Sequence, residues 1–373
     1  MRTAIVSDLH LGLASGGDVL RDPDVRALLL EEVAGAEQLV LLGDVVELRE
    51  LALGPALERA RPFFEELGEA LGERPVVLVP GNHDHRFAEP LLERLSLQGE
   101  ALGLEQRHGP AEGATAAIDE WLGPAGLEIG YPGIWLRDDV YATHGHYMDC
   151  HLRLPRFECI AVAALARLGE PPPEQAAPAD YERVFRPLYG FGFGFAQVRP
   201  APVTRTQANS AEVAWEVLAG QVEARRRSGQ LAMAGARAAF PAAIWAVNRL
   251  LRSDFESDIS GRAIFQAGLD GAAEMSRRLG IDDVHVITGH SHRAGPLAEE
   301  GEWPLAGGGS LHNTGSWVFA SAFHHPGRPP SPYWPGTLTW VEDEGPPRRV
   351  ELLREHSHAT LTELLERAAD YDS

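Results

Sequence analysis

The sequence Pro75-Val76-Val77-Leu78-Val79-Pro80-Gly81-Asn82-His83-Asp84 joins an apolar run to a polar loop. Pro75–Val79 has the length and composition of a buried strand. Gly81 allows the backbone to turn, and the next two residues offer an amide oxygen and an imidazole that titrates near neutral pH. Such residues are common in loops of every kind. The segment therefore indicates a functional site only in combination with similar segments elsewhere in the chain.

Four other segments also run from an apolar strand into a polar loop. The apolar runs are Thr3–Val6, Gln38–Leu42, Val140–Thr143 and Val284–Thr288, and they lead into Ser7-Asp8-Leu9-His10, Gly43-Asp44-Val45-Val46-Glu47, His144-Gly145-His146 and Gly289-His290-Ser291-His292. Residues 24–33, 55–71 and 90–97 have helical periodicity. This alternation predicts a layered α/β domain with largely parallel strands. Open α/β sheets place their sites just beyond the carboxyl ends of strands, where these loops are expected to lie.

The rest of the chain predicts a helical insertion and a closing set of strands. Residues 99–133 are rich in Gly and Pro and predict loop. Helical patterns over 157–168, 211–227 and 231–251 predict an insertion that forms a lid, and a further helix is expected at 262–279. Strands are predicted at 311–319, 336–341 and 349–353, followed by a helix at 360–369. The chain thus divides into a first half at 1–152, the insertion at 153–260, a second half at 261–355 and a C-terminal helix at 356–373.

Composition restricts the possible partners. The 373 residues carry a net charge of −21, which would repel nucleic acid in the absence of a local basic patch. Bound divalent cations would offset part of that charge. All 33 basic residues are Arg, which excludes chemistry that depends on Lys.

Cys150 and Cys159 have no metal-finger or disulfide-framework spacing, so a cytoplasmic protein is expected. No signal peptide and no transmembrane segment are predicted.

The strand-end loops supply oxygen and nitrogen donors suited to metal ions. These donors are Asp8, His10, Asp44, Asn82, His144, His290 and His292. Any one of them alone could be a turn residue or a buried histidine with an ordinary hydrogen bond. Together they are too many for one tetrahedral ion and suit two ions about 3.5–4 Å apart that share a carboxylate. A water between two such ions loses a proton near neutral pH, and hydrolysis of a phosphate ester is the reaction that most needs this.

The order of these motifs resembles the calcineurin-like metallophosphoesterase superfamily. The motifs are Asp-x-His, Gly-Asp-x-x-Glu, Gly-Asn-His-Asp, His-Gly-His and Gly-His-x-His, and the resemblance covers residues 1–150 and 260–355. The resemblance implies an α/β fold in which a β-sandwich is flanked by helices, here with the helical insertion added. It also implies two divalent metal ions. These ions can be Mn, Fe, Zn or Co, because each of them binds this set of donors.

The resemblance further implies a role for each residue. Asp8, His10 and His292 bind the first metal, Asp44 bridges, and Asn82, His144 and His290 bind the second. His83 faces the scissile bond and protonates the leaving oxygen, and Asp84 or Glu47 orients it. His83 and Asp84 are therefore the predicted catalytic pair.

The substrate is the least determined feature of the sequence. The resemblance implies hydrolysis of a phosphomonoester, phosphodiester or pyrophosphate bond by a metal-bridging hydroxide. The apolar, Arg-bearing insertion and a distant resemblance to the UDP-2,3-diacylglucosamine pyrophosphohydrolase branch indicate a small or lipid-linked phosphoester, with peripheral contact to a membrane. The chain departs from that branch in having His83 where Arg is usual and in its longer insertion. The alternatives are a nuclease of the superfamily, which the charge of −21 disfavours, and a non-catalytic scaffold, which the complete ligand set disfavours.

Overall fold

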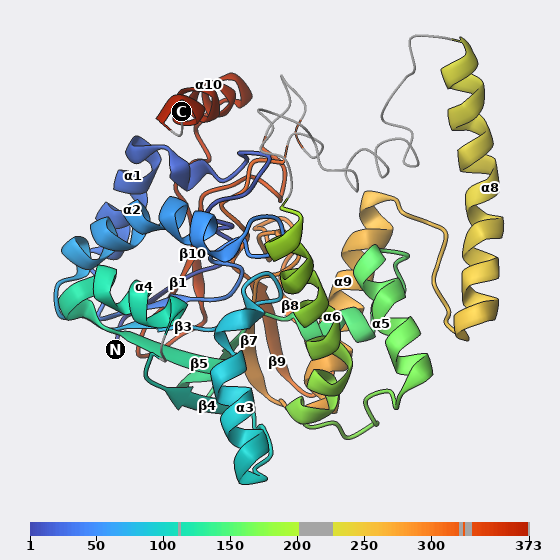
Figure 1. Cartoon of the computed structure of the whole chain (residues 1–373), viewed down its shortest axis with the longest axis horizontal. Coiled ribbons are helices and arrows are strands. Elements are labelled where there is room, and N and C mark those ends of the chain that lie inside the picture. The colour runs from blue at the N-terminus through green and yellow to red at the C-terminus, as the bar shows by residue number, and fades with distance from the viewer. Residues whose placement is uncertain (111–112, 201–226, 321–323, 325–329, 372–373) are drawn as a thin grey trace.

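A computed structural model describes residues 1–110, 113–200, 227–320, 324 and 330–371. Its eleven strands form one strongly curled sheet (Figure 1). The strands are β1 Thr3–Val6, β2 Gln38–Leu41, β3 Val76–Leu78, β4 Glu105–His108, β5 Leu127–Arg137, β6 Val140–Thr143, β7 Val284–Thr288, β8 Trp303–Pro304, β9 Gly309–Asn313, β10 Thr337–Val341 and β11 Arg348–Glu351. They follow the order β11-β10-β1-β2-β3-β5-β6-β7-β9-β8, and β4 pairs with β5.

The sheet folds into two halves because β5 belongs to both. The first residues of β5 pair in parallel with β3, and its last residues pair antiparallel with β6. Side chains from the two halves meet in a buried layer, with Ile5 and Val40 from one half and Ile134 and Ile287 from the other. This arrangement confirms the predicted β-sandwich.

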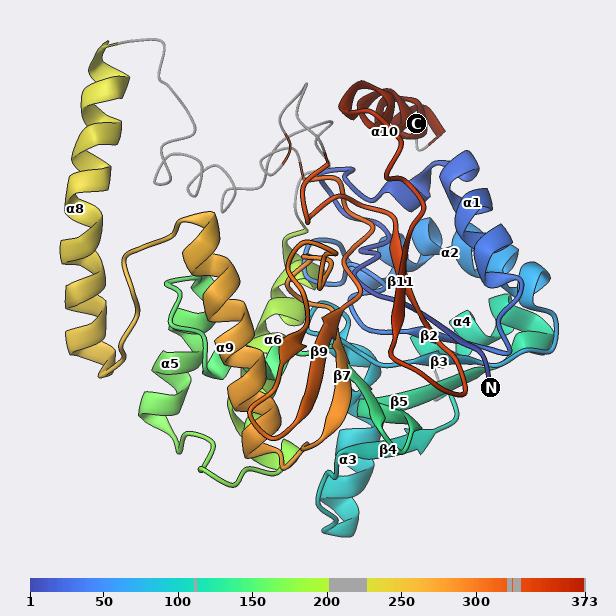
Figure 2. The same ribbon diagram turned by 180° about the vertical axis from the view of Figure 1, so that it is seen from behind.

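Helices cover both outer faces of the sandwich (Figures 1 and 2). The helices are α1 Pro23–Val33, α2 Leu53–Leu71, α3 Glu89–Gln98, α4 Ala114–Leu122, α5 Phe157–Leu168, α6 Pro178–Val198, α8 Arg227–Leu251, α9 Gly261–Arg278 and α10 His358–Tyr371, with short 3-10 turns η1 Val19–Arg21, η2 His85–Phe87, η3 Gly123–Ala125 and η4 His146–Cys150. Buried residues of α1, α2, α4 and α10 share one core with β1, β2, β3 and β10. The chain is therefore layered helix, sheet, sheet, helix.

The second outer core brings α5, α6 and α9 against the sheet. Val162 of α5, Phe185 of α6 and Met275 of α9 lie in one buried cluster with Tyr141 of β6 and Val286 of β7. The helices between 153 and 260 thus supply part of the layer that covers this half of the sandwich. Among the described helices, none is long and apolar enough to cross a membrane.

The strands that carry the polar loops pair in parallel, as the alternating pattern predicts. β1 pairs in parallel with β2, β2 with β3, and β6 with β7. The predicted strand at 311–319 is too long, because β9 ends at Asn313, whose side-chain oxygen accepts the Gly315 amide at 2.9 Å and turns the chain. The helix predicted at 211–227 falls almost wholly on residues 201–226, which lie outside the described part.

The prediction of loop over residues 99–133 is wrong, because β4, α4 and half of β5 lie there. β4 has the polar sequence Glu-Gln-Arg-His and no apolar alternation that could reveal it. α4 is short, and glycines precede and follow it. β5 contains Gly130 and Pro132, which weaken a strand pattern.

Helix α6 was not predicted because its sequence disfavours a helix. Gly190, Gly192 and Gly194 lie within it, and each costs about 1 kcal/mol relative to Ala in a helix interior. Tertiary packing compensates, since Tyr181 and Phe185 on one side of the helix are fully buried. The Phe-Gly run at 191–195 is therefore the last part of a packed helix.

Two glycines in helix interiors test this packing. A Cβ at Gly68 in α2 would overlap the backbone carbonyl of Leu122, whereas a Cβ at Gly268 in α9 would meet nothing within 4 Å. Gly68→Ala should lower the free energy of unfolding by about 1–3 kcal/mol through overpacking. Gly268→Ala should raise it by about 0.5–1 kcal/mol through helix propensity. Urea unfolding of both variants measures the difference, and equal effects would contradict the packing of α2 against α4.

Candidate metal centre

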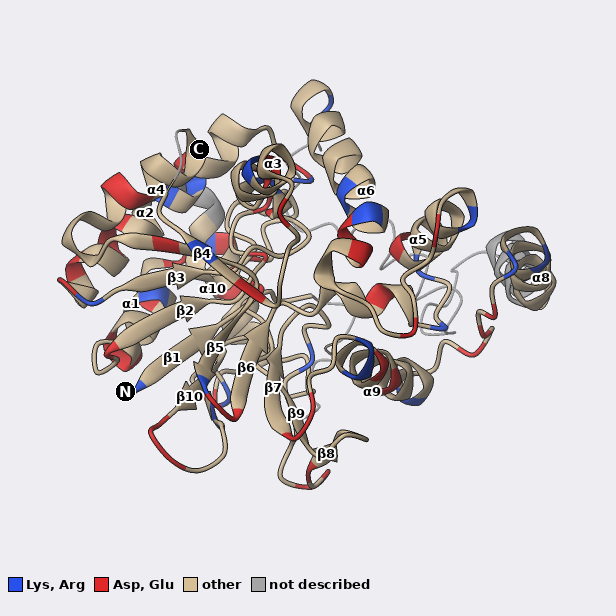
Figure 3. Cartoon of the chain, turned by 90° about the horizontal axis from the view of Figure 1, so that it is seen from below, with Lys and Arg blue, Asp and Glu red and all other residues tan. Residues whose placement is uncertain are grey.

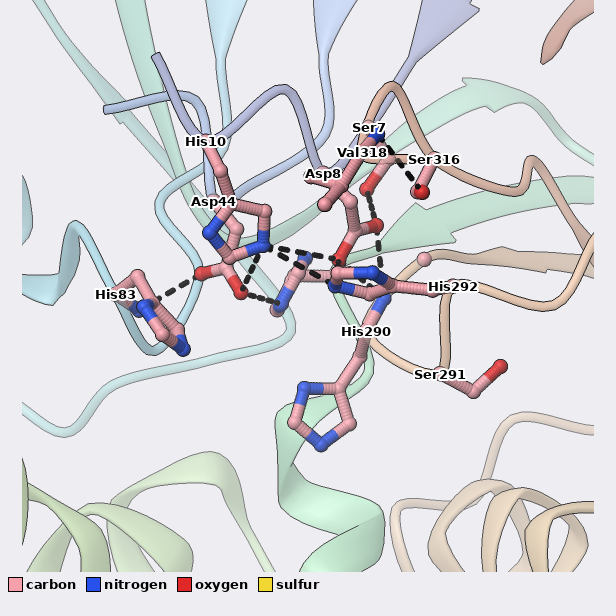
Figure 4. Close-up of polar contacts among 12 residues, drawn as sticks. Ser7, Asp8, His10, Asp44, His83, His290, Ser291, His292, Ser316 and Val318 are labelled. Carbon is pink, nitrogen blue, oxygen red and sulfur yellow. Dashed lines mark hydrogen bonds and ion pairs between the residues drawn. The ribbon is translucent and has the colours of Figure 1, made fainter. Parts of the chain in front are cut away.

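The loops that follow β1, β2, β3, β6 and β7 meet at one edge of the sandwich. They bring all seven predicted ligands together, and Figure 4 shows Asp8, His10, Asp44, His290 and His292 converging there. Most of these side chains are buried, and His292 and His83 remain partly open to solvent, at 31% and 24% exposure. The predicted ligand set is therefore a spatial cluster and not merely a pattern in the sequence.

The backbone of these loops is strained. Seven non-glycine residues of the described chain have a positive φ, and five of them are predicted ligands: Asp8, His10, Asp44, His290 and His292. Left-handed backbone is uncommon for residues with a Cβ and costs of order 1–3 kcal/mol each. Such strain gathers where the surrounding structure holds side chains in fixed positions, as at functional sites.

Asp8, His10 and His292 form a first group of facing lone-pair atoms. His292 Nε2 lies 3.3 Å from Asp8 Oδ1 and 3.1 Å from His10 Nε2. His10 Nε2 lies 4.0 Å from Asp8 Oδ1. Two imidazole nitrogens and a carboxylate oxygen at these separations suit one divalent cation between them.

Asn82, His144 and His290 form a second group, which shares Asp44 with the first. Asn82 Oδ1 lies 3.0 Å from His290 Nδ1 and 3.2 Å from both His144 Nε2 and Asp44 Oδ2. Asp44 Oδ2 lies 3.2 Å from His144 Nε2 and 3.7 Å from His10 Nε2. One oxygen of Asp44 thus stands between the two groups.

The side-chain amide of Asn82 has two possible orientations. Turned by 180°, its nitrogen would donate to His144, Asp44 and His290, and its oxygen would accept from Arg49 at 3.1 Å. With its oxygen toward the centre, Asn82 offers a ligand atom beside two imidazole nitrogens and a carboxylate oxygen. The donor set of this group therefore fits a metal ion.

The far ring nitrogens of three histidines are held by acceptors. His144 Nδ1 donates to the Leu42 carbonyl at 2.9 Å, His290 Nε2 faces Asp149 Oδ1 at 3.0 Å, and His10 Nδ1 faces Glu47 Oε2 at 2.9 Å. Each partner fixes the ring and directs the other nitrogen toward the centre, where a neutral ring would present its lone pair to a metal ion. Metal-binding histidines have this arrangement in general.

The electrostatics of the cluster favour positive charge. Burial lowers the pKa of His10, yet the hydrogen bond to Glu47 and the charge of Asp44 raise it to about 9. Burial also lowers the pKa of His144, and Asp44 more than reverses this, to about 10. Burial raises the pKa of Asp44, but His144 and His83 hold it well below its ordinary value. The carboxylates therefore stay ionised and attract cations.

Glu47 connects His83 to the first group of ligands. Its Oε2 lies 2.7 Å from His83 Nδ1 and also accepts from His10 Nδ1. The other ring nitrogen of His83, Nε2, lies 3.5 Å from Arg49 Nη1. Of the two carboxylates predicted to orient His83, Glu47 is the one that contacts the ring.

Asp84 binds the backbone of neighbouring loops. Its oxygens accept the amides of Gly81 at 2.6 Å, Val45 at 2.7 Å and Asp44 at 3.3 Å. Burial and the charge of Asp44 raise its pKa to about 6. Asp84 therefore ties the Asn82 loop to the Asp44 loop.

Glycines permit the close approach of these loops. A Cβ at Gly43 would overlap the ring of His144, and a Cβ at Gly81 would overlap the Asp44 carboxylate. Any other residue at either position would push a ligand out of the cluster.

The Asn313 side chain fastens the loop that carries His290 and His292. Its Nδ2 donates to the Gly289 carbonyl at 2.6 Å and to Ser291 Oγ at 3.1 Å. The turn that begins at Asn313 thus lies directly against the loop that carries His290 and His292.

Sequence reasoning missed the contact that α6 makes behind the centre. Glu182 is buried, and its carboxylate accepts from Tyr131 and Tyr147 at 2.5 Å and faces His85 Nε2 at 3.0 Å. His146 is buried in the same cluster, where its ring contacts Tyr131 and Tyr147. No local sequence signal reveals this, because Glu182 lies in a helix that the sequence does not predict.

Comparison with known proteins places the chain in a family. The model of the calcineurin-like phosphoesterase family matches residues 1–195. No curated protein matches the chain. Among solved structures, a dimetal phosphatase from Danio rerio aligns at 11% identity over 94% of this chain and 99% of its own, with a TM-score of 0.29. Because the family model spans more than half of the 373 residues, the chain belongs to the calcineurin-like phosphoesterase family and is a metal-dependent phosphoesterase.

Proposed function

We propose that the chain hydrolyses a phosphoester at a centre of two divalent metal ions. The observation that carries this proposal is the sharing of one Asp44 oxygen by two groups of facing donors. Asp8, His10 and His292 would hold one ion, and Asn82, His144 and His290 the other, with Asp44 bridging them. A pair of such ions supplies Lewis acidity toward the phosphoryl group and a nucleophile at neutral pH.

His83 is the proposed general acid. Glu47 fixes the ring through Nδ1, so that a proton held at Nε2 can pass to the leaving oxygen. Arg49 lies beside that nitrogen and offers a fixed positive charge to phosphoryl oxygens. Asp84 takes no part in the proton transfer in this scheme, since its oxygens are occupied by backbone amides. It acts instead as a positioning residue for the loop.

The metal ions are proposed to be Mn, Fe, Zn or Co. The donors are carboxylate, amide and imidazole atoms, and neither cysteine belongs to the cluster. This borderline set accepts several first-row divalent ions, so availability would select among them.

The insertion at 153–260 is proposed to border the substrate. Glu158 of α5 lies 3.3 Å from Arg49, and a Cβ at Gly192 of α6 would meet Arg49 at 3.5 Å. Large apolar side chains of the same insertion are exposed, with Phe157 at 70% and Phe191 at 71%. Exposed apolar patches often contact ligands or membranes, which supports a lipid-linked phosphoester as the second candidate beside a small one.

The proposal predicts metal-dependent turnover of simple esters. The protein would be stripped of metal and reloaded with Mn²⁺, and hydrolysis of p-nitrophenyl phosphate and bis-p-nitrophenyl phosphate would be followed. Turnover should require the metal, and the ratio of the two rates separates monoesterase from diesterase. Asp44→Asn removes the bridging charge and should abolish turnover, whereas Asp138→Asn, an exposed surface change, should not.

Three outcomes would redirect this proposal. Near-normal turnover by Asp44→Asn would refute the two-metal centre. Absence of turnover with two metals bound per chain would indicate a substrate larger than these esters, such as a lipid-linked one. Absence of both metal and turnover would favour a non-catalytic scaffold.

His83→Ala should preserve metal content but lower turnover of esters with poor leaving groups by roughly 10²–10⁴-fold. Esters with good leaving groups need less protonation and should lose less. Steady-state rates with a series of aryl phosphates of rising phenol pKa measure this dependence. Equal losses across the series would contradict the role of general acid.

Asp149→Ala should weaken metal binding by about 10–100-fold, because His290 loses the partner that fixes its ring. Asp149→Asn keeps an acceptor at that position and should lose less. Competition with a chelator measures the affinity, and saturating metal should restore turnover. Unchanged affinity in both variants would show that His290 needs no support from Asp149.

A further inference from the structure

A groove of about 530 Å³ runs between α6 and the segment that follows the Asn82 loop. Its walls include His85, Arg86, Arg183, Arg186, Tyr189 and Phe193. It follows α6 from Glu182 to Phe193, a length of about 16 Å at the helical rise per residue. This volume and this mixture of aromatic and charged walls are typical of small-molecule sites.

The groove gathers basic residues in a strongly acidic protein. The net charge is −21, yet three arginines line this one groove together with Glu89 and Glu182. Figure 3 shows basic and acidic positions side by side on α6. Arg186 is paired with Glu89 at 2.7 Å, and Arg183 with Asp180 at 2.6 Å. Arg86 is exposed, and the described residues give it no ion pair or hydrogen bond. Its guanidinium is thus available to an anion.

Aromatic rings form the wall between the groove and the metal centre. The guanidinium of Arg86 lies 5.6 Å from the ring of Phe193. The ring of Tyr189 lies 5.2 Å from His85 and 5.6 Å from His146, and His146 lies 5.7 Å from the ligand His144. Planar or apolar groups bind well against such rings.

The groove lies close to the loop that carries His83. His85 and Arg86 follow His83 in the chain, so the nearer wall begins within about 7 Å along the backbone. Arg49 Nη1 lies 3.5 Å from His83 Nε2. Gly192, next to Phe193 in α6, faces Arg49 and has no side chain. A chain of contacts through Arg49 and Gly192 thus joins His83 to the groove wall at Phe193.

We propose that this groove binds the leaving group of the substrate, and that Arg86 binds a second anionic group carried on it. The inference rests on the proposed function. It defines the substrate class as a phosphoester whose leaving group contains a planar or apolar portion and a distal phosphate, phosphonate or carboxylate. Water attacks the scissile phosphorus, the bond from phosphorus to the leaving oxygen breaks, and that oxygen takes a proton from His83.

A matched pair of esters tests the proposal. The metal-loaded full chain would hydrolyse 4-(phosphonomethyl)phenyl phosphate and 4-methylphenyl phosphate, which differ in the distal anion. The wild-type protein should prefer the first in kcat/KM, and Arg86→Ala should reduce that preference by about 10-fold. Arg94→Ala removes an exposed arginine of α3 outside the groove and should leave the preference unchanged. An unchanged preference in Arg86→Ala would overturn the proposal.

Benzylphosphonate separates the leaving-group site from a site for a free anion. Added with p-nitrophenyl phosphate, it should not alter kcat. A change in kcat that Arg86→Ala removes would assign the groove to a separate effector and overturn the leaving-group assignment. If no ester is hydrolysed, calorimetry with benzylphosphonate tests the groove independently of the proposed function. Equal affinity of the wild-type protein and Arg86→Ala would then refute the role of Arg86.

Discussion

The site depends on the parallel register of strands on both halves of the sandwich. Val6 pairs with Leu41, Leu41 with Leu78, and Ala142 with Ile287 across the sheet. These pairs fix where each strand ends and therefore where each ligand loop begins. Both faces of β1 and β2 are buried, so a slip of one residue would exchange the side chains that face the helices with those that face the other half of the sandwich. The packing of apolar strand residues thus sets the positions of the polar atoms at the edge.

The cluster of predicted ligands lowers the stability of the fold, and residues around the cluster hold it in place. Asp8, Asp44 and Glu47 are buried carboxylates, and several neighbours adopt left-handed backbone. The contacts that offset this cost come from behind the centre, where Asp84 binds backbone amides and Asn313 binds the Gly289 carbonyl. Natural proteins often concentrate strain at a site while the rest of the fold supplies the stability.

The sequence predicted the parts of the site that are local. Asp8, Asp44, Asn82, His144 and His290 each follow an apolar run, and short segments suffice to recognise them. The β-sandwich followed from the order of these segments and the family resemblance. The predicted bounds of helices lie close to the observed bounds where apolar periodicity is strong, as in α1 and α2.

The parts that could not be predicted depend on long-range contacts. Whether Asp84 or Glu47 orients His83 is decided by which oxygen reaches the ring, and both lie in the same kind of loop. β4 is polar because it pairs with β5 alone, so its sequence carries no sign of burial. α6 is stabilised by residues that lie far away in the sequence. Its glycines lower the helix propensity of the segment, so propensity alone does not predict a helix there.

The position of α6 also bears on how the insertion can vary. Glu182 binds Tyr131 of β5, Tyr147 beside the His144 loop, and His85 beside the Asn82 loop. A helix attached in this way cannot shift without moving the loops that carry the predicted metal ligands, because a buried carboxylate that loses its partners is costly. Arg86, on the surface of the groove, has no such contact with the described residues. If the groove binds the leaving group as proposed, substrate preference can change at Arg86 while the buried face of α6 stays fixed.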